Sequence, residues 1–225
     1  RAEGRHIGPP FNDGDFYKWL EAAACIVGET GDADLDRDLD GYIAVIRQVQ
    51  REDGYIFTRH AIQSRANPDV KPMARDMDFE VYNLGHLMTA GCTHYRATGK
   101  TNLLAAGEKA AEYLDRARRA AGDTPPRTAI CPSHYMGLAD LYGTTGKRKY
   151  LDLLEALIKM RDRVEGGTDD NQDRIPLKEH REILGHAVRA NYLYAGVTDL
   201  VMAGGDEDYR DVLHAVWEDL AGHKV

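Results

Sequence analysis

The sequence has few cysteines, no long apolar run and no excess of positive charge, and each shortage excludes a class of protein. Cys25, Cys92 and Cys131 are far apart and odd in number, so they predict neither a disulfide framework nor a Cys-x-x-Cys metal knuckle. No apolar stretch approaches the roughly 20 residues of a membrane-spanning helix. We therefore expect a soluble chain with no membrane partner, and both cytoplasm and periplasm stay open. The net charge of −8 predicts no nucleic-acid partner, because binding to phosphates needs a basic surface.

Common catalytic and nucleotide-binding motifs are missing as well. Ser133 has no Gly-x-Ser-x-Gly context, and GGTDDN at 166–171 has neither the lysine nor the preceding strand of a phosphate-binding loop. The histidines lack the His-x-x-x-His spacing of zinc enzymes, which disfavours a metal site made from them. Function must therefore be sought in residues that only the fold brings together.

What the sequence does contain is a repeat carried by its turns, namely TGDADL at 30–35, TGKTNL at 98–103, TGKRKY at 145–150 and GGDEDY at 204–209. Each turn lies between two segments of helical periodicity, and its glycine is suited to end the first helix in the left-handed conformation. The first helix of each pair is the more apolar, whereas the second has a charged outer stripe. The pattern predicts an all-α fold in which about four of the six helical hairpins of an (α/α)6 toroid are present. An open helical-repeat array is the alternative, and GYIFT at 54–58 is the one strand-like segment, which fits a loop equally well.

Long connections at 52–77 and 166–180 lead from an outer helix into the next inner helix, so they lie at one end of the assembly. The polar residues at that end of the inner helices are Asp13, Asp15, Tyr17, Glu80, Tyr82, His86, Ser133, His134, Glu179, Glu182 and His186. Imidazole, carboxyl and phenol groups suit a polyhydroxyl ligand, because each sugar hydroxyl both donates and accepts hydrogen bonds. This end is therefore predicted to bind carbohydrate.

Two Gly-His pairs, Gly85-His86 and Gly185-His186, stand at the heads of inner helices, and we take their histidines and His134 to occupy equivalent positions of the repeat. The glycines cost helix propensity, which indicates either close packing or close approach of a ligand. The predicted sugar-binding residues are His86, His186, His134, Asp15, Tyr82 and Glu182.

Three segments resemble the β-L-arabinofuranosidases of glycoside hydrolase family 127 and its relatives, namely FNDGDFYKWLEA at 11–22, EVYNLGHLMTAGCTHYRATGK at 80–100 and IPLKEHREILGHAVRANYLYAG at 175–196. The resemblance implies an (α/α)6 barrel, a retaining glycosidase acting on an arabinofuranoside or related sugar, and sugar-binding histidines that match His86 and His186. A third histidine of the family lies in a Gly-His-x-Glu-like segment. Here that stretch reads AICPSHYMGL, so Cys131 and His134 are imperfect equivalents.

The resemblance also implies a cysteine nucleophile held on zinc and a glutamate acid/base. In the family these residues fall later than the point that matches Val225, and none of the three cysteines here matches them. We therefore expect no catalytic residue and no bound cofactor in this chain, with zinc in the full-length family enzyme. Residues 1–225 are expected to form a single unit that continues beyond Val225. An incomplete toroid has an apolar flank that another segment, or a second copy in a homo-oligomer, would cover.

Two other functions stay open. The chain could be a non-catalytic carbohydrate-binding or scaffold module. It could also belong to another α-toroid carbohydrate enzyme, such as a lyase or an unsaturated-uronyl hydrolase, in which Asp15 or Glu80 acts as acid/base.

Overall fold

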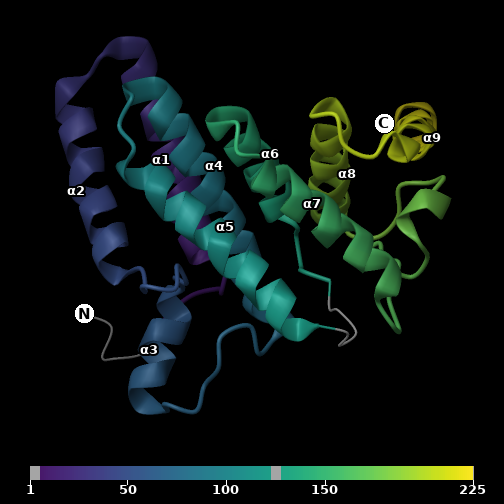
Figure 1. The fold of residues 1–225 in the computed structure, drawn as a ribbon, viewed down its shortest axis with the longest axis horizontal. Helices are drawn as coiled ribbons and strands as arrows, with labels where there is room; N and C mark the ends of the chain where they lie inside the picture. The colour runs from purple at the N-terminus through teal and green to yellow at the C-terminus, as the bar shows by residue number, and fades with distance from the viewer. Residues whose placement is uncertain (1–5, 123–127, 225) are drawn as a thin grey trace.

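The computed structural model describes residues 6–122 and 128–224, and over these ranges the chain is helical with no β-strand (Figure 1). The main helices are α1 (Asn12–Thr30), α2 (Ala33–Val49), α3 (Thr58–Ala66), α4 (Glu80–Thr98), α5 (Asn102–Ala121), α6 (Ser133–Thr145), α7 (Arg148–Met160), α8 (Ala187–Met202) and α9 (Arg210–Asp219). Short helical turns are η1 (Asp76–Asp78), η2 (Arg161–Arg163), η3 (Leu177–Glu179), η4 (Glu207–Tyr209) and η5 (Leu220–Lys224). The all-α prediction is confirmed.

Four helical hairpins lie within the described part, and they are those predicted from the turns: α1–α2, α4–α5, α6–α7 and α8–α9. Gly31, Gly99 and Gly146 end the first helices of three hairpins with φ of 67°, 74° and 69°, which L side chains adopt only with strain. The N–H of each glycine donates to the carbonyl oxygen four residues earlier. Gly204, with φ of 80°, turns the fourth hairpin.

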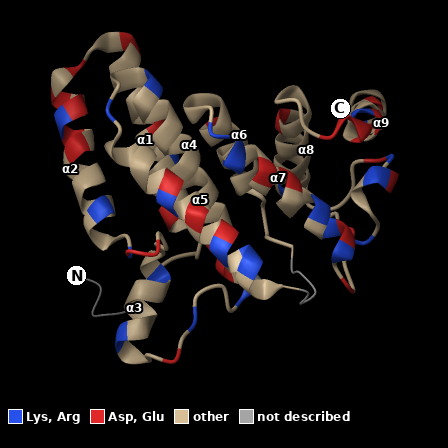
Figure 2. Ribbon diagram, in the orientation of Figure 1, with Lys and Arg blue, Asp and Glu red and all other residues tan. Residues whose placement is uncertain are grey.

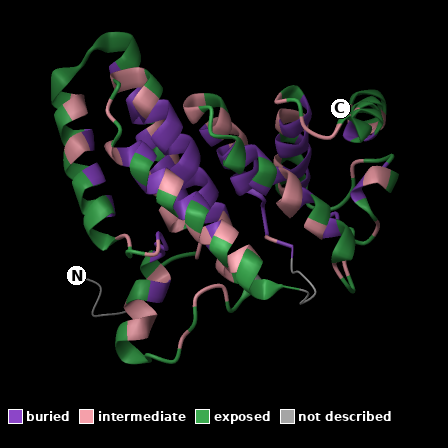
Figure 3. Cartoon of the chain, viewed as in Figure 1, coloured by how far each residue is buried: buried purple, intermediate pink, exposed green. Residues whose placement is uncertain are grey.

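The first helices form an inner row in which α1 contacts α4, α4 contacts α6 and α6 contacts α8. Helix α4 lies within this row, and every residue from Tyr82 to His94 is buried (Figure 3). Lys, Arg, Asp and Glu gather instead on the outer helices α2, α5 and α7 (Figure 2). The predicted division into apolar inner and charged outer helices is therefore confirmed.

Glycines allow the inner helices to approach each other closely. A β-carbon at Gly85 would lie 2.2 Å from Ser133 Oγ and 2.3 Å from the backbone nitrogen of His134, at the start of α6. A β-carbon at Gly196 of α8 would lie 2.3 Å from that of Tyr135. The glycine before His86 is thus required for helix packing rather than for the approach of a ligand.

The second Gly-His pair has a different backbone. Gly185 lies in the turn before α8 with φ of 75°, and a β-carbon there would lie 1.9 Å from the carbonyl oxygen of Asp169. Since α8 begins only at Ala187, this glycine serves a turn and costs no helix propensity.

The connection at 52–77 is more ordered than a loop, because it contains α3. The strand-like segment before it is a buried loop, in which Tyr55 and Phe57 are 1% and 3% exposed. Tyr55 Oη donates to Glu80 Oε1 over 2.6 Å, which fastens this loop to the start of α4. Within residues 6–122 and 128–224, no helix has the length and apolar character needed to cross a membrane.

Candidate functional site

Five side chains from α1, α4 and α8 form a continuous polar cluster at the N-terminal ends of the inner helices. Lys18 Nζ lies 2.8 Å from Asp15 Oδ1 and donates to Tyr82 Oη over 2.9 Å. One turn further along α4, His86 Nε2 lies 2.9 Å from Tyr192 Oη of α8. Because α6 separates α4 from α8 in the row, this contact requires the inner helices to curve around a common interior. We call these five residues the His86 cluster.

The aromatic rings of the cluster meet edge to face. The Tyr82 ring centroid lies 4.6 Å from that of His86 and 5.8 Å from that of Tyr192, at interplanar angles of 77° and 87°. Lys18 Nζ also lies 5.5 Å from the Tyr82 centroid, within cation–π range. Such packing fixes the orientation of the ring edges, while Asp15 and Lys18, which are 50% and 41% exposed, open the cluster to solvent.

His86 is a neutral imidazole at neutral pH. Burial and then the positive charge of Lys18 lower the pKa of His86 to about 4, against a smaller opposing effect of Asp15. Its Nδ1 is buried without a hydrogen-bond partner, so Nε2 is the nitrogen that engages a neighbouring helix. Burial also raises the pKa of Tyr192, which keeps its hydroxyl protonated.

His186 and Glu182 lie at the same loop end but outside the His86 cluster. His186 immediately precedes α8, its side chain is exposed, and its backbone N–H donates to the carbonyl oxygen of Asp170 over 3.2 Å. The Asp170 carboxylate pairs with Arg189, which holds this loop against α8. Glu182 is exposed and lines a cavity of about 310 Å³ together with Glu179.

His134 is separated from the other two histidines. It is the second residue of α6, is 3% exposed, and lines a different cavity of about 190 Å³ with Tyr135 and Arg161. Burial, and then the charge of Arg161, lowers the pKa of His134 to about 3, so this imidazole is also neutral. The prediction that the three histidines take equivalent repeat positions is wrong: His86 is the seventh residue of α4, whereas His186 lies outside α8. Local sequence does not reveal where each helix begins.

The carboxylate of Glu80, a candidate acid/base, is engaged in hydrogen bonds within the protein. Its carboxylate is 5% exposed and accepts hydrogen bonds from Tyr55 Oη and from the backbone N–H of Met73. Burial raises its pKa. Because both carboxylate oxygens bind residues of the connection at 52–77, the geometry favours a structural role for Glu80.

Residues that the sequence did not reveal complete the surroundings of the cluster. Lys18 could have been found, since it stands three residues after Asp15 on a helix, a spacing at which opposite charges meet. Tyr192 had no local signal, because its contact with His86 depends on the curvature of the row. Cys131, which the sequence did point to, packs against Tyr82, and its backbone φ is 51°. Burial raises the pKa of its thiol, and the charge of Arg189 opposes this effect.

The cysteines do not fit the zinc centre that the resemblance implies. Cys25 is exposed on α1, whereas Cys92 and Cys131 are buried at separate places. In the part of the chain that the structure describes, the one group of three potential metal ligands is Asp36, Asp40 and His94, and it contains no cysteine. Cys25, Cys92 and Cys131 therefore do not form a shared zinc site.

Comparison with known proteins decides the family. The sequence matches the profile of the β-L-arabinofuranosidase catalytic domain of glycoside hydrolase family 127 over residues 2–225. The chain belongs to glycoside hydrolase family 127. The resemblance stated from the three sequence segments is thereby confirmed, and the four hairpins form part of the helical toroid of this family.

Relatives of this family 127 chain are considerably longer than it is. A solved glycoside hydrolase is 44% identical with a TM-score of 0.78, and the match covers 93% of this chain and 32% of that one. The family 127 β-L-arabinofuranosidase of Geobacillus stearothermophilus T6 is 29% identical with a TM-score of 0.82, covering 97% and 37%. The non-reducing end β-L-arabinofuranosidase of Bifidobacterium longum subsp. longum is 28% identical, covering 97% and 36%. The chain thus spans about a third of the length of these relatives.

Proposed function

We propose that this family 127 chain forms the sugar-binding wall of a retaining β-L-arabinofuranosidase active site. The observation that carries the proposal is the His86 cluster, in which three inner helices of the toroid bring imidazole, phenol, ammonium and carboxylate groups together at one end. Two relatives that match nearly the whole chain are named as β-L-arabinofuranosidases. The proposed substrate is therefore a terminal arabinofuranoside or a closely related sugar.

The protonation states of the cluster suit hydroxyl recognition. A neutral imidazole has one donor and one acceptor nitrogen, so His86 can exchange its bond to Tyr192 for a bond to a sugar hydroxyl. Lys18 supplies donors and Asp15 supplies acceptors at the exposed edge, while the Tyr82 ring can pack against the apolar side of the sugar. His186 and Glu182 would approach the same sugar from the connection before α8.

Bond cleavage is assigned to other parts of the enzyme. The family resemblance implies that the cysteine nucleophile, its zinc and the glutamate acid/base fall later than the point that matches Val225. We infer that sequence outside residues 1–225 supplies them, and that the residues here bind and orient the sugar. Binding of the sugar would be stronger in the transition state if the hydroxyl contacts tighten as the ring flattens.

Replacing His86 or His186 by alanine tests this assignment in the full-length enzyme. Each change should lower kcat/KM for a β-L-arabinofuranoside, by about 10- to 100-fold for the buried His86 and by up to about 10-fold for the exposed His186, because each loses a hydrogen bond to the sugar. His214→Ala removes an exposed imidazole from the outer helix α9 and should leave kcat/KM unchanged. Unchanged kcat/KM in both His86→Ala and His186→Ala would show that these residues do not bind the substrate.

Tyr192→Phe tests whether Tyr192 positions His86. The variant keeps the aromatic packing but loses the hydroxyl, so kcat/KM should fall by about 2- to 10-fold, and the nuclear magnetic resonance titration of the His86 ring should shift. Tyr150→Phe is the matched control, because Tyr150 Oη donates to Glu108 over 2.8 Å in the outer layer. A loss of activity as large in Tyr150→Phe as in Tyr192→Phe would contradict a positioning role.

A further inference from the structure

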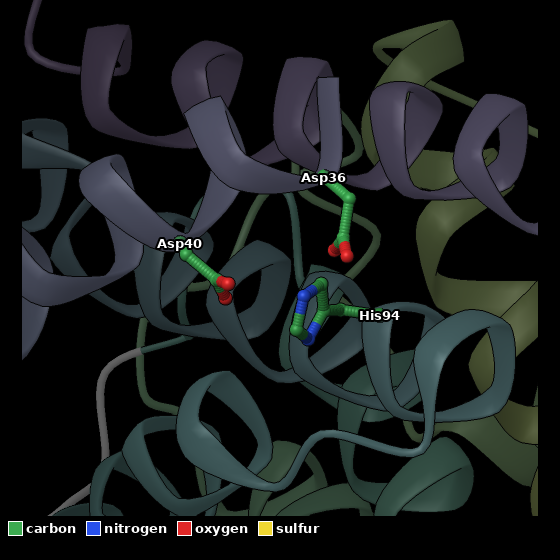
Figure 4. A group of neighbouring side chains, drawn as sticks. All are labelled: Asp36, Asp40 and His94. Atoms are coloured by element: carbon green, nitrogen blue, oxygen red, sulfur yellow. The ribbon is translucent and has the colours of Figure 1, made fainter. Parts of the chain in front are cut away.

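A second polar group lies toward the other end of α4, away from the His86 cluster. Asp36 and Asp40 of α2 face His94 of α4, and Figure 4 shows both carboxylates directed toward the imidazole ring. One potential ligand atom from each residue lies within 4.8 Å of the others. The sugar-binding proposal uses none of these residues, and the family resemblance assigns no role to them.

His94 is the unusual member of this group. Its side chain is 1% exposed, and neither Nδ1 nor Nε2 has a hydrogen-bond partner. A buried polar atom without a partner is costly, and native structures contain few of them. Metal ions bind imidazole in its neutral form, through a nitrogen that has no other partner.

Lys100 shows that the two carboxylates already form a site for a cation. Its Nζ lies 2.7 Å from Asp36 Oδ1 and 2.7 Å from Asp40 Oδ2, yet it forms no hydrogen bond with His94. The Lys100 side chain is 34% exposed, so its ammonium can move into solvent without a change in the helices. A divalent ion in its place could use the imidazole as well as the carboxylates.

We propose that Asp36, Asp40 and His94 form a binding site for a divalent transition-metal ion, with Lys100 as the group that the ion displaces. Two carboxylates and one neutral imidazole suit ions such as Mn²⁺ or Zn²⁺, with water completing the coordination. Bonds of about 2.1 Å place ligand atoms about 3.4 Å apart. Asp36 and Asp40 are 30% and 44% exposed, which leaves them room to rotate toward such an ion.

The ion would act as a structural clamp between the outer helix α2 and the inner helix α4. Helix α2 contacts the rest of the protein through the buried Leu39, Ile43 and Ile46 and through Tyr42, whose ring meets those of Phe16 and Trp19 of α1 edge to face. A metal ion would add a bond from α2 to α4. Binding of a metal to the folded form alone would therefore stabilise the first hairpin.

Binding of Mn²⁺ to the chelator-treated protein, followed by electron paramagnetic resonance, tests the site, because Mn²⁺ favours oxygen and nitrogen ligands over the free cysteines. We expect one saturable site per chain and a nitrogen coupling to the bound ion that His94→Gln removes. Asp40→Asn should weaken the affinity by about tenfold or more. Lys100→Met should strengthen it several-fold, because the competing ammonium is gone.

Asp38→Asn is the matched control, since it removes an exposed carboxylate of α2 that is not one of the proposed ligands. This variant should bind Mn²⁺ with the same affinity as the unmodified protein. Far-ultraviolet circular dichroism verifies that each variant is folded, and Asp40→Asn remains decisive if the buried change His94→Gln prevents folding. The proposal is overturned if Lys100→Met shows no saturable Mn²⁺ binding. It is equally overturned if Asp40→Asn binds like Asp38→Asn, or if bound Mn²⁺ shows no nitrogen coupling.

Discussion

Gly85→Ala is expected to lower the free energy of unfolding by about 3 kcal/mol, because the added methyl group has no space. The β-carbon would lie 2.3 Å from the backbone nitrogen of His134 and 2.6 Å from the carbonyl carbon of Ser133. Backbone atoms cannot rotate away as a flexible side chain can, so α4 and α6 would have to separate. Both helices are buried at this point, and the separation would disturb the contacts of their neighbours. Urea denaturation followed by circular dichroism measures the change.

Gly41→Ala provides the matched control for this prediction. Gly41 lies within α2, and a β-carbon there has no neighbouring atom within 4 Å. Since alanine has a higher helix propensity than glycine, this change should raise the free energy of unfolding by up to about 1 kcal/mol. Equal effects of Gly85→Ala and Gly41→Ala would show that α4 and α6 do not pack as closely as the structure indicates.

The hairpins could be predicted from the sequence because their turns depend on local chemistry. Gly31 ends α1 in a conformation that glycine adopts at low cost, and Asp32 caps α2 by accepting hydrogen bonds from the backbone N–H groups of Asp34 and Leu35. Helical periodicity then separated inner from outer helices. These features depend only on neighbouring residues in the sequence, not on distant parts of the chain.

The site could be predicted only in part, because identical local sequences have different surroundings. Gly85 and Gly185 both precede a histidine, yet one lies within a helix packed against α6 and the other in a left-handed turn. Distant segments decide this difference, namely the start of α6 in the first case and the loop around Asp169 in the second. Tyr192 was missed for the same reason, since the curvature of the inner row brings it to His86.

Lowering the pH from 7.5 to 5 is expected to decrease the free energy of unfolding, because His86 and His134 together cause a loss of about 4 kcal/mol, against an opposing gain of about 1 kcal/mol from Asp199. The pKa of His86 is lowered to about 4 and that of His134 to about 3, whereas both are near 6.5 in the unfolded chain. A histidine with a lowered pKa binds its proton mainly in the unfolded state, so stability is lost as the pH falls below about 6.5. Each of these buried imidazoles contributes about 2 kcal/mol at pH 5.

Two variants test this pH dependence. For each, the free energy of unfolding is measured by urea denaturation at several pH values between 7.5 and 5, and its slope against pH is compared with that of the unmodified protein. His134→Gln removes one of the protons taken up on unfolding, so its stability should depend less steeply on pH. Asp199 acts in the other direction, because burial and then the charge of Asp140 raise its pKa to about 6. Protonation of Asp199 favours the folded state as the pH falls, so Asp199→Asn should make the loss of stability steeper. Identical slopes in the two variants would mean that neither group is linked to folding in this pH range.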